Sequence, residues 1–541
     1  MGLTALAFPF IFGLVVNAHK RIAYNRRQAL LLKKINIKEA NLANGKLKEQ
    51  DGGTEYLDKK HPYINDLDIF GDNSIFQLLN RTTTKSGRDL LAGWLSNNNN
   101  AAELLDRQDA VKELSEMLEW RQELEAKGLH FKRQESNSDE LIDWIKTPQP
   151  IPTFFKVCAW LFPFLIIPSI GLNIYSDWPV YATLILALVS GFVVNRFQEP
   201  LKILTETVAK HISVLGAYST LIGQLENASF KSKKLQELKV TVSPTGKAAS
   251  TVIQELFKVL DFLNSRTNML YWMVNVPLLF DIHIMVMAER WKAKNQNDVS
   301  KWFEAISELE ALCSLAGLSY ANPAFAYPIF AEQEYHFEAF NLGHPLISEQ
   351  ERINNDYALS GRGSTSIITG SNMSGKSTFL RTLGVNITLA HAGAPVCAAS
   401  LELSTIQLFT SMRTEDNLEE HVSSFYAELQ RIQSLLSLVE KGKPVLYMLD
   451  EILKGTNSQD RHIGAVSLAK QLANTNSFGL ISTHDLALGQ LEKSMDNISN
   501  YSFNSEIKGD EIVFPYLLEK GVCRSFNASK LMEKIGIKIS K

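Results

Sequence analysis

The stretch that decides the fold of this chain is Gly370-Ser371-Asn372-Met373-Ser374-Gly375-Lys376-Ser377, which fits the pattern GxxxxGK[ST]. The β-rich run 366–369 precedes it, and a helical pattern opens at Thr378. The glycines let backbone N–H groups point into the loop, where the positive N-terminus of the following helix also attracts phosphate. The stretch therefore predicts a strand, a phosphate-binding loop and a helix, with residues 370–378 as the nucleotide-binding segment.

Two side chains of this loop have a predicted role toward ATP and Mg²⁺. Lys376 is expected to neutralise charge on the β- and γ-phosphates, and the Ser377 hydroxyl to complete the Mg²⁺ shell. A glycine-rich turn without function is the alternative, and the downstream sequence argues against it.

Two later apolar runs end in polar residues. The first leads into Asp450 and Glu451, and the second into His484. Because the carboxyl ends of buried parallel strands meet a ligand at one edge of a sheet, these residues should lie near the loop. We expect Asp450 to hold Mg²⁺, Glu451 to polarise the attacking water and His484 to sense the γ-phosphate. Alone, such residues are more often a strand end and a structural histidine.

These segments resemble the ATPases of the MutS family. The similar segments are 369–381, with Asn372-Met373 inside the loop, 408–428, 450–460 and 482–485. The resemblance implies a MutS-type nucleotide-binding domain over about 341–537, hydrolysis of ATP with Mg²⁺, and a homodimer. It also implies that Ser423 reaches the ATP of the partner subunit. A local N-cap role for Ser423 or Ser424 is the alternative.

The resemblance extends upstream of the loop. Segments 343–346 and 354–356 are similar to those that flank the adenine, with Arg352 where the family commonly has an aromatic residue. Segment 70–88, followed by 105–114, looks like the start of the MutS helical core. The family couples its ATP state to a clamp around DNA. Too few residues precede the core for a mismatch-reading domain, so we expect DNA binding without mismatch recognition. No nuclease-like extension is expected after Ile537.

Composition limits how DNA is bound. The 541 residues include 55 basic and 58 acidic ones, which gives a formal charge of −3. No positive field of the whole protein draws in nucleic acid, so any DNA site is a local patch. Lysines that could touch phosphate are equally explained as a solvated face. The four cysteines lie far apart and predict buried, reduced thiols.

Long apolar runs predict membrane segments. Between 157 and 195 the one charged residue is Asp177, which separates two runs near the length of a bilayer crossing. They predict a transmembrane hairpin, with a buried helical pair of a soluble core as the alternative. The apolar run 3–16 precedes seven basic or histidine residues, which favours a cytoplasmic side for them over a cleaved signal peptide. Residues 269–287 contain Asn275 and Asp281 and predict a packed core helix.

Together these features predict a multidomain protein. We expect it to consist of an all-α helical core with transmembrane helices and a C-terminal α/β P-loop ATPase domain of the ABC type. The expected parts are an N-terminal transmembrane segment (1–18), a cytoplasmic helical region that is MutS-core-like from about 65 (19–155), a transmembrane hairpin (156–196), a helical continuation (197–322) and the ATPase domain (323–541). We expect a multi-pass protein of the cell membrane with its ATPase in the cytoplasm. The alternatives are an ABC-type pump and a membrane tether that uses ATP as a switch.

Overall fold

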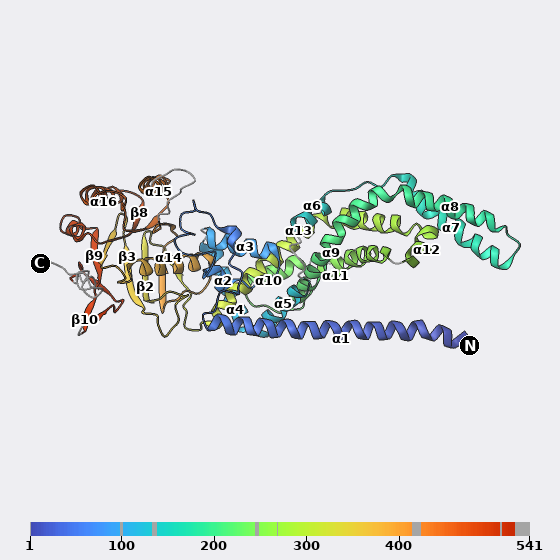
Figure 1. Ribbon diagram of the computed structural model, residues 1–541, viewed down its shortest axis with the longest axis horizontal. Coiled ribbons are helices and arrows are strands. Elements are labelled where there is room, and N and C mark those ends of the chain that lie inside the picture. The colour runs from blue at the N-terminus through green and yellow to red at the C-terminus, as the bar shows by residue number, and fades with distance from the viewer. Residues whose placement is uncertain are drawn as a thin grey trace. The chain divides into compact units, whose positions relative to one another are not determined.

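The computed structural model of the protein describes residues 2–97, 101–131, 138–243, 248–267, 269–413, 424–508 and 511–524. The chain forms two compact units (Figure 1). Unit 1 comprises Met1–Ile37, Arg81–Leu90 and Met117–Ala311. Unit 2 comprises Lys38–Asn80, Leu91–Glu116 and Leu312–Lys541. The N-terminal part of the chain is thus shared between both units, an interleaving that the sequence-based boundaries do not contain.

Unit 1 is helical, as the sequence predicts for this part of the chain. Its helices, two of which continue into unit 2, are α1 (Gly2–Ala43), α5 (Leu118–Phe131), α6 (Ser138–Lys146), α7 (Thr153–Tyr175), α8 (Val180–Arg196), α9 (Gln198–Glu226), α10 (Lys233–Val242), α11 (Ala249–Asp261), α12 (Met269–Leu278) and α13 (Phe280–Ala321). Tyr218 of α9 stacks on Phe303 of α13 with ring centroids 3.7 Å apart. Buried Glu310 accepts hydrogen bonds from the backbone N–H groups of Thr83 and Thr84. These contacts fix α13 against its neighbours.

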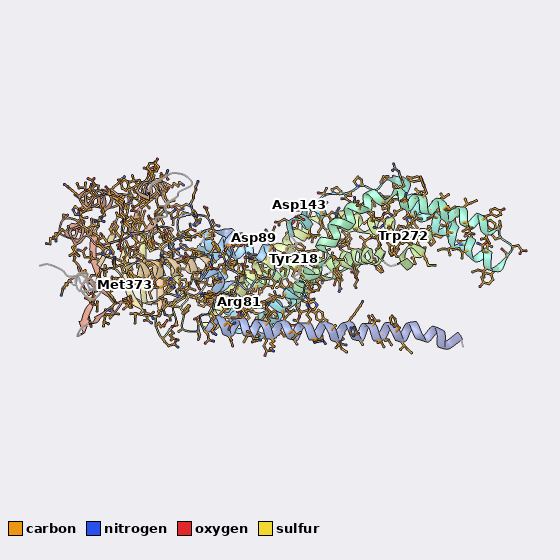
Figure 2. All side chains as sticks on the ribbon, in the orientation of Figure 1. Arg81, Asp89, Asp143, Tyr218, Trp272 and Met373 are labelled. Atoms are coloured by element: carbon orange, nitrogen blue, oxygen red, sulfur yellow. The ribbon has the colours of Figure 1, made fainter. Side chains whose placement is uncertain are left out.

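The helices α7, α8 and α12 carry an exposed apolar surface. Side chains project outward from this part of the chain, among them Trp272 of α12, which is 46% exposed (Figure 2). Phe164 of α7 and Leu188 of α8 are 72% and 74% exposed. A helical pair in the core of a soluble protein usually buries such side chains, whereas those of this hairpin are exposed in the chain.

One of the described helices, α7, is long and apolar enough to cross a bilayer. Its partner α8 has 17 residues and is too short by the same measure, because at 1.5 Å per residue it spans about 25 Å. The two predicted spans therefore form the expected pair of helices, but the second is shorter than a full crossing. The predicted segment 1–18 forms the beginning of the longer helix α1, whose first side chains lie outside the described ones.

The segment 269–287, expected to form one core helix, forms the two helices α12 and α13 instead. The chain bends by 73° between them, and the two are long and apolar enough for a membrane span only when taken together. Leu279 at the bend has φ +45°. Asp281 accepts hydrogen bonds from Tyr271 and Asn275, which satisfies the polar groups at the break. The outer face of α12 stays apolar and exposed.

In the described residues, unit 2 contains two larger sheets and a two-stranded one. The strands are β1 (Ile329–Phe330), β2 (His336–Leu342), β3 (Asn355–Ser360), β4 (Thr365–Gly370), β5 (Ser400–Leu403), β6 (Gln407–Ser411), β7 (Val445–Asp450), β8 (Ser477–Thr483), β9 (Ile498–Phe503) and β12 (Leu518–Lys520), with β10 (Glu506–Lys508) and β11 (Glu511–Val513) as a separate hairpin. One sheet has the order β1-β5-β2-β3, and the larger has the order β12-β9-β4-β8-β7-β6. In the larger sheet only β12 is antiparallel. The mixed sheets at the C-terminal part confirm the predicted change from helical to α/β structure.

Helices cover both faces of the larger sheet. The helices of unit 2 are α2 (Ile75–Leu79), α3 (Lys85–Ser96), which begins in unit 1, α4 (Ala101–Glu116), α14 (Lys376–Ala392), α15 (Ser424–Val439) and α16 (Ser458–Leu472). Tyr447 and Leu449 of β7 pack into a core with α15 and α16. Met448 lies against Gly384 of α14 on the other face. Since side chains alternate along a strand, Asp450 falls on the α14 face, and this places its carboxylate beside the start of that helix.

Candidate functional site

The loop between β4 and α14 requires its two glycines. Gly375 has φ +106°, and a Cβ there would lie 3.0 Å from the ring of Tyr516. A Cβ on Gly370 would lie 2.6 Å from Ser374 Oγ and 2.9 Å from the carbonyl oxygen of Phe503. Between them Met373 also takes positive φ. The loop is therefore tightly turned, and its backbone leads directly into the N-terminus of α14, a favourable place for an anion.

Lys376 lies inside this loop. Its side chain is 4% exposed, and Nζ donates to the carbonyl oxygens of Gly370 at 2.9 Å and Ser371 at 3.0 Å. Nζ also lies 3.5 Å from Nε2 of His484. Burial lowers the pKa of Lys376, with the carboxylates of Glu451 and Asp450 acting in the opposite direction. The ammonium is thus held with neutral acceptors, which an incoming phosphate can replace.

Acceptor oxygens gather where β7 ends beside α14. The Ser377 hydroxyl donates to Asp450 Oδ2 at 2.5 Å. Three buried oxygen atoms here have no hydrogen-bond partner among the described residues: Asp450 Oδ1, Ser371 Oγ and Ser374 Oγ. Buried polar atoms without partners are uncommon and call for a ligand or water. A carboxylate and a hydroxyl are oxygen ligands of the type that Mg²⁺ prefers, so Asp450 and Ser377 fit this ion.

Glu451 follows β7 and is paired with two basic side chains. Its carboxylate accepts a hydrogen bond from Nε2 of His484 and forms an ion pair with Lys454 Nζ at 2.9 Å. The hydrogen bond with His484 and the neighbouring Lys454 lower the pKa of Glu451 to about 2, against the opposing effect of burial. Glu451 is therefore a carboxylate at neutral pH. His484 lies between it and Lys376, so three predicted site residues are in contact.

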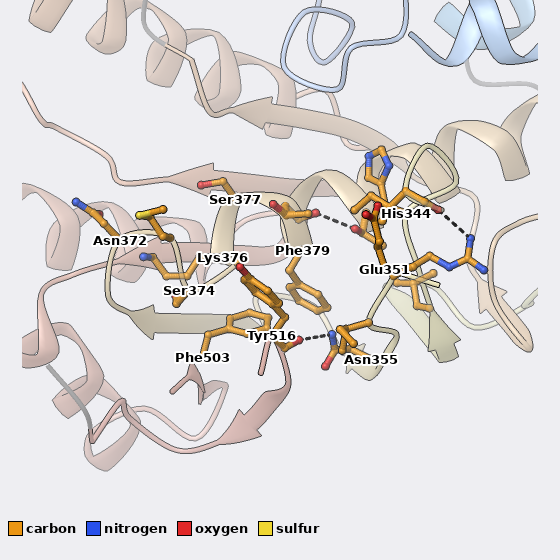
Figure 3. A pocket seen from close by; sticks show the side chains of 18 of the residues that line it. His344, Glu351, Asn355, Asn372, Ser374, Lys376, Ser377, Phe379, Phe503 and Tyr516 are labelled. Atoms are coloured by element: carbon orange, nitrogen blue, oxygen red, sulfur yellow. Dashed lines mark hydrogen bonds between the residues drawn. The ribbon is translucent and has the colours of Figure 1, made fainter. Parts of the chain in front are cut away.

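Lys376, Ser377 and Glu451 line a pocket of about 490 Å³, a size typical of small-molecule sites (Figure 3). The predicted residues Asn372, Met373, Ser374, Gly375, Lys376, Ser377, Thr378 and Glu451 all line it. Phe379, Phe503 and Tyr516 add aromatic surface. Sequence reasoning missed Tyr516, which lies 141 positions after Gly375 in the chain and has no motif around it. Its backbone carbonyl accepts a hydrogen bond from Asn355 Nδ2 at 3.0 Å, which draws the C-terminal segment to the pocket.

The segments expected beside the adenine also reach this pocket. His344, Arg352 and Asn355 line it. Arg352 Nε donates to Asn354 Oδ1 at 3.1 Å, and a Cβ on Gly343 would clash with both side chains. Burial lowers the pKa of His344 to about 4, with Arg381 adding to the shift. His344 is therefore neutral at physiological pH.

An N-terminal segment supports the site, and sequence reasoning did not find this contact. Asp66 accepts hydrogen bonds from Thr410 Oγ1 at 2.7 Å and from the backbone N–H of Arg413 at 3.0 Å. Asp68 accepts from the Arg413 guanidinium at 2.7 and 2.9 Å and lies 3.4 Å from Arg381 of α14. The pairs join residues more than 300 positions apart in the chain, so no local pattern indicates them. They connect the helix after the loop with the end of β6.

The predicted site residues thus divide into two groups. Gly370 to Thr378, Asp450, Glu451 and His484 converge at the ends of β4, β7 and β8, while Ser423 lies outside the described residues. The four cysteines are buried and form no disulfide bond, as expected. The assigned roles of the converging residues stay predictions.

Comparison with known proteins gives matches to the same part of the chain. Residues 366–537 match the family model described as MutS domain V. The chain is 30% identical over 244 residues to the DNA mismatch repair protein MutS of Thermotoga neapolitana, covering 44% of this chain and 30% of that protein. It is 27% identical over 301 residues to the protein of the same name from Clostridioides difficile, covering 54% of this chain and 30% of that one. The chain therefore spans about 30% of the length of these relatives.

Proposed function

Since this chain belongs to the MutS family, we propose that it is a membrane-anchored ATPase that hydrolyses ATP at the β4–α14 pocket. We propose that it works as a dimer and couples ATP binding and hydrolysis to a clamp around DNA. The observation that carries the proposal is that Lys376 and Glu451 line one pocket, while Asp450 accepts a hydrogen bond from Ser377, which lines the same pocket. The matched segment contains Lys376, Asp450 and Glu451. Each has the chemistry that phosphoryl transfer to water needs: a cation for the phosphates, an oxygen ligand for a metal ion and a carboxylate for the nucleophile.

The residues act on the substrate as follows. Lys376 exchanges its carbonyl partners for phosphate oxygens, and the N-terminus of α14 adds its partial positive charge. Ser377 and Asp450 hold Mg²⁺, which supplies charge neutralisation at the phosphates when bound. Glu451 orients the attacking water, and its low pKa keeps it an acceptor. His484 senses the γ-phosphate, since it contacts both Glu451 and the side chain of Lys376 that binds phosphate.

The base of the nucleotide fits the part of the pocket outside the phosphate loop. Tyr516, whose ring lies beside Gly375, supplies an aromatic face to the pocket. Arg352 supplies a planar guanidinium where the resemblance leads one to expect an aromatic ring. Asn355 holds the backbone of Tyr516 in place. We propose that these two side chains flank the adenine.

The exposed apolar side chains of α7 and α8 support the membrane part of the proposal. Their outward surface suits acyl chains, and Lys156 and Arg196 stand near the two ends of the hairpin. We propose that the hairpin enters the bilayer of the cell membrane with both ends on the cytoplasmic side. The same surface favours a second candidate function, a membrane tether that uses ATP as a switch without binding DNA.

Two measurements on the detergent-solubilised full-length protein test the proposal. Phosphate release from ATP should require Mg²⁺, and protein without Mg²⁺-dependent release would not be an ATPase. Titration with duplex, mismatched and branched DNA, with and without ATP, separates the two candidates. Binding that changes with the nucleotide supports the clamp, and an ATPase without DNA binding supports the tether.

A further inference from the structure

The turn after β7, residues 451–454, has an unfavourable backbone. Glu451 has φ +51° and Leu453 has φ +59°, a region that side chains other than glycine and asparagine rarely adopt. Such conformations persist when surrounding contacts hold them. The direction of the Glu451 side chain depends on this turn, so whatever holds the turn also places Glu451.

Glu428 of α15 holds the turn. Its carboxylate accepts hydrogen bonds from two successive backbone N–H groups, those of Leu453 and, at 3.1 Å, Lys454. Phe425, one helical turn earlier, packs against Gly455, where a Cβ would lie 2.6 Å from Phe425 Cβ. The backbone N–H of Glu451 donates to the carbonyl oxygen of Ser482 at 2.9 Å. The turn is therefore fixed from α15 on one side and from β8 on the other.

Packing alone does not account for a carboxylate at this position. Glu428 is 5% exposed, and burial raises its pKa while the two N–H bonds act in the opposite direction. A buried carboxylate is costly unless its hydrogen bonds compensate, and an apolar side chain of similar size would fill the same space at less cost. What glutamate adds is a pair of acceptor oxygens directed at the turn.

We infer that Glu428 is a positioning residue for ATP hydrolysis, because it holds the 451–454 turn in the conformation that presents Glu451 to the pocket. The inference rests on the proposed ATPase function. It has a second consequence. Glu428 belongs to the second turn of α15, which begins at Ser424 directly after Ser423. A displacement of the start of α15 would thereby reach Glu451 through Glu428, with Phe425 packed against the same turn.

The test compares Glu428→Gln with Gln433→Ala, a control on an exposed position of the same helix. Glutamine keeps the size of the side chain, but its NH₂ group faces one of the two N–H donors. We expect kcat for ATP to fall roughly 10- to 100-fold, the effect of losing one hydrogen bond to a charged group. Affinity for a fluorescent ADP analogue and KM should stay within about threefold of wild type, since Glu428 does not line the pocket. Gln433→Ala should match wild type in all three.

A double-mutant cycle separates positioning from a general loss of structure. If Glu428 acts through Glu451, then adding Glu428→Gln to Glu451→Gln should not slow the residual single-turnover hydrolysis further. A multiplicative effect of the two changes, or wild-type kcat in Glu428→Gln, contradicts the inference. If Glu428→Gln does not fold, Glu428→Asp is the test, and wild-type kcat in that variant contradicts the inference equally. Absence of hydrolysis in the wild-type protein refutes instead the proposed function.

Discussion

Lys376→Ala should abolish nucleotide binding while the protein stays folded. The ammonium donates to two carbonyl oxygens, and burial lowers its pKa, so the folded protein disfavours its charged form. Removing it loses two modest hydrogen bonds and relieves a desolvation cost of similar size. We therefore expect Tm of the nucleotide-free variant to stay within about 4 °C of wild type, about 1 kcal/mol for a domain of this size.

The loss of affinity follows from the same contacts. Lys376 Nζ donates hydrogen bonds to the carbonyl oxygens of Gly370 and Ser371. When a nucleotide binds, the same two hydrogen bonds can be made to phosphate oxygens. Charge-assisted hydrogen bonds contribute about 1.5–3 kcal/mol each, so the two together predict a loss of about 3–6 kcal/mol, or roughly 10²- to 10⁴-fold in Kd.

The Glu451→Gln variant should lose hydrolysis and keep nucleotide binding. Glutamine preserves the shape of the pocket wall, so Kd should stay within about threefold while kcat falls roughly 10²- to 10³-fold.

Three assays check this pair of variants: titration with a fluorescent ATP analogue, phosphate release, and thermal unfolding without nucleotide. Lys441→Ala, an exposed lysine of the same unit, is the matched control for loss of positive charge and should behave as wild type in each assay. Equal loss of binding in Lys376→Ala and Glu451→Gln would refute the separate roles. So would normal binding in Lys376→Ala.

Three further predictions concern topology, DNA and the dimer. In a background without cysteine, a membrane-impermeant reagent should label Asp177→Cys in intact cells but not Lys202→Cys or Lys508→Cys; labelling at position 508 would overturn the proposed orientation. DNA binding should be steeply salt-dependent, and a preference for mismatched over matched duplex above roughly tenfold, about 1.4 kcal/mol, would reveal a reading element not identified in this chain. Mixing Ser423→Ala with Lys376→Ala subunits should restore hydrolysis that neither shows alone, because one composite site per mixed dimer is intact. Full activity of Ser423→Ala by itself would disprove the shared site and favour the N-cap role.

Much of the candidate site could be predicted because its chemistry lies in short, contiguous motifs. The loop from Gly370 to Ser377 encodes its own conformation, since Gly370 and Gly375 stand where a Cβ would clash or where φ is positive. Asp450 and His484 directly follow apolar strands, and parallel pairing brings their ends together whatever the intervening sequence contains. The lengths of the candidate membrane helices were harder to predict. A run of apolar residues does not show where a helix begins, and α8 begins two residues after the start of the second apolar run.

The sequence by itself determined the order of helical and α/β parts, the phosphate-binding loop and the residue types at the ends of β4, β7 and β8, because these depend on local conformation and side-chain periodicity. Only the tertiary structure decided what supports them: Glu428 beneath the turn of Glu451, Tyr516 beside Gly375, and Asp68 between two arginines. Each of these contacts joins residues from 25 to more than 300 positions apart. A carboxylate or an aromatic ring contributes to the site only when the fold brings its partner into contact with it. The physical reason is that contacts between residues so far apart in the sequence depend on how whole helices and strands pack. The local sequence around either residue therefore does not predict them.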